Sequence, residues 1–112
     1  MKFLKHKAEY KRMRREASQA LRSTGLTVEA FLSLSEMDGT SKMADIAAKV
    51  CLDGPSLSRV RGFLVENNFA KPVKNRHDSD PRTVYMKATP KGLRILNKYK
   101  NEIFTILGGK NG

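Results

Sequence analysis

The chain has 112 residues, which is enough for one domain with a modest hydrophobic core and too few for two independent cores. Lysine and arginine number 22 against 11 acidic residues, so the formal charge is +11, a balance typical of proteins that bind nucleic acid or an anionic membrane. No apolar run approaches the roughly 20 residues of a membrane span, and residues 1–10 lack the apolar centre of a signal peptide. We therefore expect a cytoplasmic protein that does not span a membrane.

The cysteine and histidine content argues against a metal site, a disulfide and an enzyme. Cys51 is the only cysteine, and His6 and His77 lie far apart, so one chain cannot assemble a disulfide or a Cys/His zinc cluster. The acidic residues are scattered, and no nucleophile has a base beside it. We expect no metal, no cofactor and no catalytic residues. Cys51 ends an apolar helical stripe, and we expect it to be a small buried hydrophobe.

The N-terminal part of the chain predicts two helices. Apolar residues at spacings of three and four indicate a first helix of about five turns. Its seam consists of Phe3, His6, Tyr10, Met13, Ala17 and Ala20. Thr24 and Gly25 are expected to end this helix, and Thr27 to cap a second one that runs to about Met37. The second helix is expected to bury Phe31, Leu32 and Leu34.

Two short helices joined by a tight turn are predicted next. After a turn at Asp38-Gly39, Ser41 is expected to cap a third helix that stops near Cys51-Leu52. Its buried face is Met43, Ile46, Ala47 and Val50. Asp53 is placed as the N-cap of a fourth helix that extends to about Asn67. Its inward residues are Leu57, Val60 and Leu64, and Pro55, Ser58, Arg59 and Gly62 project from the opposite side.

The last third predicts a hairpin and a final helix. Residues 69–73 and 83–88 are expected to be strands around a basic polar loop, residues 74–82. Thr89 and Pro90 begin the last helix, and Gly108-Gly109 ends it. Its broad apolar face consists of Leu93, Leu96, Tyr99, Ile103, Phe104, Ile106 and Leu107.

The predicted fold is mainly α with a small β-hairpin wing (α+β), a winged helix-turn-helix, because the order helix, helix, helix, strand, strand, helix is a winged-helix order. Residues 1–108 form this single domain, with N- and C-terminal dimerisation helices, and residues 109–112 are expected to be a flexible tail. The most specific motifs are Pro55-Ser56-Leu57-Ser58-Arg59 and the pair Asp80-Pro81-Arg82 and Thr89-Pro90-Lys91-Gly92. Together with Leu26-Thr27 and Ile46-Ala47, these motifs resemble the MarR/SlyA transcription regulators over residues 26–95, as a short member with a truncated C-terminal region.

This resemblance implies a homodimer whose recognition helix reads the major groove of DNA and whose wing arginine enters the minor groove. By matched position, Ser58 and Arg59 would contact DNA, Arg82 would be the wing arginine, and Asp80 would orient it by a salt bridge. Further DNA contacts are expected from Pro55 and Ser56 at the start of the recognition helix, and from Lys74, Arg76 and His77 on the wing. Arg61 lies nearer the apolar side, and its role stays open.

The apolar faces of the first and last helices exceed what the core of a chain this small needs, and this surplus predicts a homodimer. The expected dimer residues are Phe3, Tyr10, Met13, Ala17, Leu96, Tyr99, Ile103 and Leu107. We expect a sequence-specific regulator of transcription on double-stranded DNA, acting as a repressor, with any small-molecule effector unspecified. The alternative is an architectural or accessory winged-helix protein of a virus or mobile element, which coats DNA or docks a protein.

Overall fold

The computed structural model describes residues 2–74, 80 and 83–108, with the backbone alone for residues 2–8. Within these residues the elements follow the predicted order. They are α1 (Lys2–Ala20), the 3-10 helix η1 (Arg22–Thr24), α2 (Val28–Ser35), α3 (Met43–Val50), α4 (Gly54–Glu66), β1 (Ala70–Val73), β2 (Tyr85–Ala88) and α5 (Pro90–Gly108). The predicted tail, residues 109–112, lies outside the described residues.

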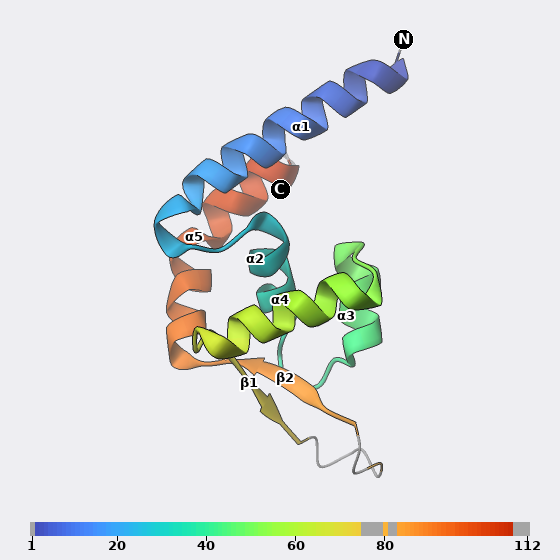
Figure 1. Cartoon of the computed structure of the whole chain (residues 1–112). Coiled ribbons are helices and arrows are strands. Elements are labelled where there is room, and N and C mark those ends of the chain that lie inside the picture. Colours follow the sequence, from blue (N-terminus) through green and yellow to red (C-terminus); the bar gives the residue numbers. More distant parts are fainter. Residues whose placement is uncertain (1, 75–79, 81–82, 109–112) are drawn as a thin grey trace.

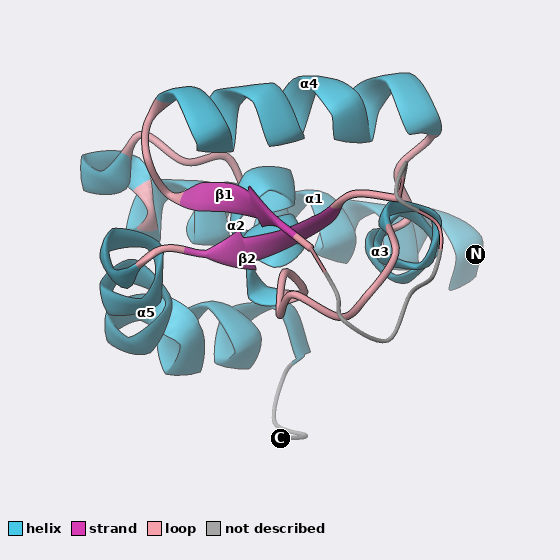
Figure 2. Cartoon of the chain, turned by 90° about the horizontal axis from the view of Figure 1, so that it is seen from below, coloured by secondary structure: helices cyan, strands magenta, loops and turns pink. Residues whose placement is uncertain are grey.

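The helices and the hairpin divide the molecule into two ends (Figure 1). At one end, α2, α3 and α4 pack together, and the hairpin follows α4. At the other end, α1 lies beside the second half of α5, whose first half runs up from the hairpin. Seen from below, the hairpin lies between α4 and α5 (Figure 2). The core between these elements contains the fully buried side chains of Leu21, Phe31, Leu34, Ile46, Leu64, Met86 and Ile103.

Two helix starts form as their sequences predict. The hydroxyl of Thr27 accepts a hydrogen bond from the backbone N–H of Ala30 at 3.0 Å and caps α2. The carboxylate of Asp53 accepts one from the N–H of Ser56 at 2.7 Å and caps α4. Each bond satisfies one of the N–H groups that the first turn of a helix leaves without a partner. The start of α4 is therefore fixed by its own sequence.

The expected cap at Ser41 is wrong, because the turn before α3 is organised by Asp38. One oxygen of the Asp38 carboxylate accepts the N–H groups of Thr40 and Ser41 at 2.8 and 2.9 Å. These bonds lower the pKa of Asp38, the Thr40 N–H first among the causes, because they stabilise the ionised carboxylate. The N-cap position of α3 is Lys42, which makes no side-chain cap.

The hairpin is antiparallel, with Ala70 opposite Ala88 and Val73 opposite Tyr85. Residues 37–39 run beside β2 and bond to it, whereas the sequence predicted only a turn there. The N–H of Ala88 donates to the carbonyl of Met37 at 3.1 Å, and the N–H of Gly39 donates to the carbonyl of Met86 at 2.9 Å. The segment between α2 and α3 is thereby joined to the hairpin, which fixes the hairpin relative to both helices.

Candidate nucleic-acid interface

The outer side of α4 is the predicted DNA-reading surface, and it is exposed. Pro55, Ser58, Arg59 and Gly62 are all exposed, whereas Leu57 and Leu64 on the opposite side are buried. The helix lies along one edge of the molecule beside the hairpin (Figure 2). A single helix with one free side is the shape that enters the major groove of B-form DNA. The predicted division between inner and outer residues is confirmed.

Arg59 is held near the start of α4. A guanidinium nitrogen of Arg59 donates to the hydroxyl of Ser56 at 3.3 Å, one helical turn earlier. The pKa of the Asp53 carboxyl is lowered, first by the backbone N–H of Ser56 and also by the charge of Arg59. Ser56 is half-buried, and its hydroxyl accepts this hydrogen bond. Arg59 is thus an exposed cation with a preferred direction.

Arg61 lies on the side of α4 that faces α3. It is half-buried and borders a shallow hollow between the two helices. The hollow is also lined by Met43, Ala44, Ala47, Gly54, Leu57 and Ser58. The position of Arg61 agrees with the sequence pattern, which placed this residue nearer the apolar side of the helix.

Only part of the predicted wing site falls on described residues. Lys74 and Asp80 are exposed. Arg76, His77 and Arg82 lie outside the described residues, and so does the expected salt bridge between Asp80 and Arg82.

The structure adds a pair of cations on the hairpin that sequence reasoning missed. Lys71 and Lys87 are directly opposite each other in the register and both are exposed. Residues directly opposite in an antiparallel pair share one face, and like charges there repel. The signal that would have found them is the strand register, which the sequence alone leaves undefined. A phosphate backbone beside the hairpin would relieve this repulsion.

The predicted dimer residues separate into two groups. Ala17 and Ile103 have 0% exposed surface within one chain, so the prediction that they contact a dimer partner is wrong. They belong to the core of the single chain. Leu96, Tyr99, Met13 and Leu107 are half-buried and Tyr10 is 56% exposed, so these side chains keep surface for a partner. The side chain of Phe3 lies outside the described residues.

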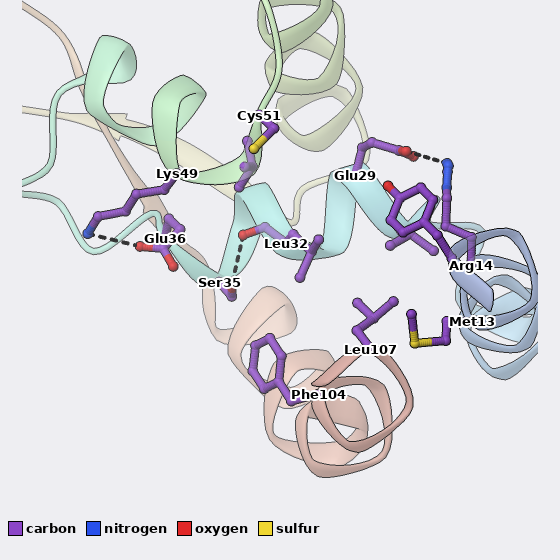
Figure 3. Close-up of a pocket in the computed structure, with 13 residues that line it drawn as sticks. Met13, Arg14, Glu29, Leu32, Ser35, Glu36, Lys49, Cys51, Phe104 and Leu107 are labelled. Carbon is purple, nitrogen blue, oxygen red and sulfur yellow. Dashed lines mark hydrogen bonds and ion pairs between the residues drawn. The ribbon is translucent and has the colours of Figure 1, made fainter. Parts of the chain in front are cut away.

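Several of these side chains surround one hollow, of about 330 Å³, between α1, α2, α3 and α5 (Figure 3). Its apolar lining includes Tyr10, Met13, Leu32, Val50, Phe104 and Leu107. Two ion pairs lie at the border of the hollow. One joins Arg14 to Glu29, and the other joins Lys49 to Glu36 at 3.4 Å. Cys51 also lines the hollow and is exposed, so the expectation that it is buried is wrong. The reason is that Cys51 has φ 58° and ends α3, which turns its side chain away from the core stripe.

The described residues contain no group of three or more His, Cys, Asp or Glu side chains placed to share a metal ion. No helix among them combines the length and apolarity needed to cross a bilayer.

An antiparallel hairpin directly after the second helix of a helix-turn-helix defines a winged helix-turn-helix fold. The sequence matches no protein-family model and no curated protein. Solved structures do match. S. aureus MepR, in a DNA complex, has a TM-score of 0.80 at 18% identity, over 100% of this chain and 85% of MepR.

Two further structures share the architecture. The reduced form of MarR from E. coli has a TM-score of 0.77 at 20% identity, over 98% of this chain and 77% of MarR. AbsC, a MarR family transcriptional regulator from Streptomyces coelicolor, has a TM-score of 0.74 at 21% identity, over 94% of this chain and 72% of AbsC. The chain therefore has the winged-helix fold of MarR-family transcriptional regulators, and the predicted fold class is confirmed.

Proposed function

We propose that this protein is a cytoplasmic, sequence-specific regulator of transcription that binds double-stranded DNA as a homodimer and acts as a repressor. The observation that carries the proposal is the exposed outer side of α4, which presents Ser58 and Arg59 next to a basic hairpin. Support also comes from the shared fold, since MepR and an E. coli MarR variant were solved in complex with DNA. Repression is the simplest action for a domain that occupies a DNA site and so excludes other proteins from it.

The reading mechanism follows from the chemistry of these side chains. A guanidinium can donate two parallel hydrogen bonds to O6 and N7 of guanine in the major groove, so Arg59 supplies sequence preference. Ser58 is small enough to approach bases or phosphates without a clash. Lys74, Lys71 and Lys87 on the hairpin bind phosphates, which adds affinity that does not depend on sequence.

Competition between specific and random DNA tests this function. A site selected from a random pool of duplexes is labelled and challenged with a large excess of random duplex. A specific regulator is expected to prefer the selected site by about a thousandfold or more. A preference near unity, or a pool that yields no enriched site, would instead support the architectural or accessory reading.

A homodimer is expected because exposed apolar side chains gather on α1 and α5. Tyr10 is 56% exposed and Phe104 is 45% exposed, and both border the same hollow. Sedimentation should give about twice the chain mass of 12.6 kDa. Footprinting should show a pseudo-palindrome with half-site centres roughly 34–36 Å apart. A strict monomer at tens of micromolar, with and without DNA, contradicts the dimer.

A further inference from the structure

The outer side of α1 carries a stripe of positive charge that the proposed reading surface does not use. We define this outer stripe as Lys11, Arg12 and Arg15 on α1 and Arg22 just beyond its end; all four are exposed. The opposite side packs into the molecule through Ala17 of α1 and through Leu21, which directly follows the helix; both are fully buried. The outer stripe therefore faces away from the core.

Among the side chains that the structure describes, the cations of the outer stripe have no ion-pair partner. Among the described side chains, the ion pairs join Arg14 to Glu29 and Lys49 to Glu36. Arg12 and Arg15 are three residues apart, and Lys11 and Arg15 are four apart, so they are neighbours on one helix surface. Like charges at these spacings destabilise a helix unless an anion lies beside them, and the run from Lys11 to Arg22 contains one acidic residue, the exposed Glu16.

A second basic group continues the stripe where α1 ends. The hydroxyls of Ser23 and Tyr99 are 3.1 Å apart, which ties the segment after α1 to α5. The ammonium group of Lys98 lies 5.4 Å from the centre of the Tyr99 ring. Arg22 precedes Ser23 in the chain, so Arg22 and Lys98 are each next in sequence to one of the two residues in this contact.

The helix α1 and the hairpin lie on opposite sides of α2 and α4 (Figure 1). The molecule measures 50 Å along its longest axis and 29 and 25 Å across. A duplex bound by α4 and the hairpin would thus leave the outer stripe uncovered, and the α1 residues assigned to the dimer, Tyr10 and Met13, lie on another side of that helix. Whatever anion the stripe binds is a separate ligand.

The chemistry of the outer stripe favours DNA over a membrane or an acidic protein. An interfacial helix inserts its apolar face into lipid, whereas the outer stripe is the charged face of α1. The apolar face contains the buried Ala17 and, at Tyr10 and Met13, the surface assigned to the dimer. Protein interfaces rely on buried aromatic or aliphatic anchors, and the outer stripe with Ser18 and Gln19 between its cations has none. Residues 11 to 22 span roughly 16 Å of helix, and arginine binds phosphate oxygens with two parallel hydrogen bonds.

We propose that the outer stripe binds the phosphate backbone of a second DNA duplex, so that one protein molecule bridges two DNA segments. The first segment is the one held by α4 and the hairpin, and in this respect the inference rests on the proposed function. Binding at the outer stripe is independent of base sequence, because it involves phosphates alone.

A capture experiment tests the bridge. Beads carry a duplex with the selected site, or a random duplex if selection yields none, and a fluorescent random duplex is added with the protein. The variant Arg12→Gln/Arg15→Gln is compared with Arg94→Gln/Lys100→Gln, which removes the same charge from exposed positions of α5. The stripe variant is expected to retain about tenfold less fluorescent duplex, and the salt dependence of capture should fall by about 0.9 per lost phosphate contact. Binding to the bead duplex alone should stay within about twofold of the wild type.

Each other outcome has a distinct meaning. Equal capture of DNA by the two double variants overturns the bridge. The bridge is also wrong if the stripe variant loses binding to phosphatidylserine vesicles but captures DNA as well as the wild type does. If the selected site fails to emerge but capture still depends on the outer stripe, the proposed function is wrong and the second DNA site stands. If the selected site emerges and capture is absent, the reading surface stands and the bridge is wrong.

Discussion

Arg59→Ala is expected to weaken binding to the selected site by about 1–3 kcal/mol per half-site, and to weaken binding to random DNA much less. Arg59 is exposed on the outer side of α4 and is directed by its hydrogen bond to Ser56. A side chain that reads a base edge contributes only where the correct base is present. Specificity is therefore expected to fall together with affinity.

The measurement compares the affinity for the selected-site duplex with the affinity for a random duplex at several salt concentrations.

Arg76→Ala, on the wing loop predicted from sequence, is expected to weaken binding to the two duplexes about equally. It should also reduce the salt dependence of binding by about 0.9 per lost phosphate contact, or nearly two units in a symmetric dimer. Arg82→Ala should fall between the two and harm A·T-rich flanks most, because a narrow minor groove attracts cations. Equal losses on both duplexes for Arg59→Ala would refute its role as a reader.

The features that sequence predicted well are those encoded within a few residues. The caps at Thr27 and Asp53 depend on a side chain that bonds an N–H three residues later, so the local sequence suffices. The inner and outer sides of α4 follow from helical periodicity in the same way. Periodicity placed Ser58 and Arg59 on the outer side of α4, and the resemblance to the MarR/SlyA regulators implied their contact with DNA, which stays a prediction.

The features that were missed depend on contacts between distant segments. Asp38 replaces Ser41 in organising the turn before α3 because segment 37–39 pairs with β2, and that pairing is invisible in the local pattern. Cys51 continues an apolar stripe in sequence, but its left-handed backbone turns it outward. Ile103 was assigned to a dimer because periodicity marks apolar residues without saying which chain buries them.

The junction between β1 and α5 is one such contact between distant segments, and it explains why residue 92 is glycine. A Cβ at Gly92 would lie 2.1 Å from the carbonyl oxygen of Phe69, far inside van der Waals contact. That carbonyl cannot move away easily, because it accepts the N–H of Thr89 at 3.0 Å. The Thr89 hydroxyl in turn accepts the N–H of Gly92 at 3.1 Å and donates to the carbonyl of Asn68 at 2.6 Å.

Gly92→Ala is therefore expected to lower the free energy of unfolding by about 3 kcal/mol or more, because the first turn of α5 must separate from the start of β1. Gly62→Ala is the matched control: nothing lies within 4 Å of its Cβ position, and it occupies the interior of α4. Alanine is the better helix former, so Gly62→Ala is expected to raise the free energy of unfolding by about 0.5–1 kcal/mol. Urea denaturation measures both variants. A Gly92→Ala protein as stable as the wild type would show that α5 and β1 are not held together as closely as these contacts require.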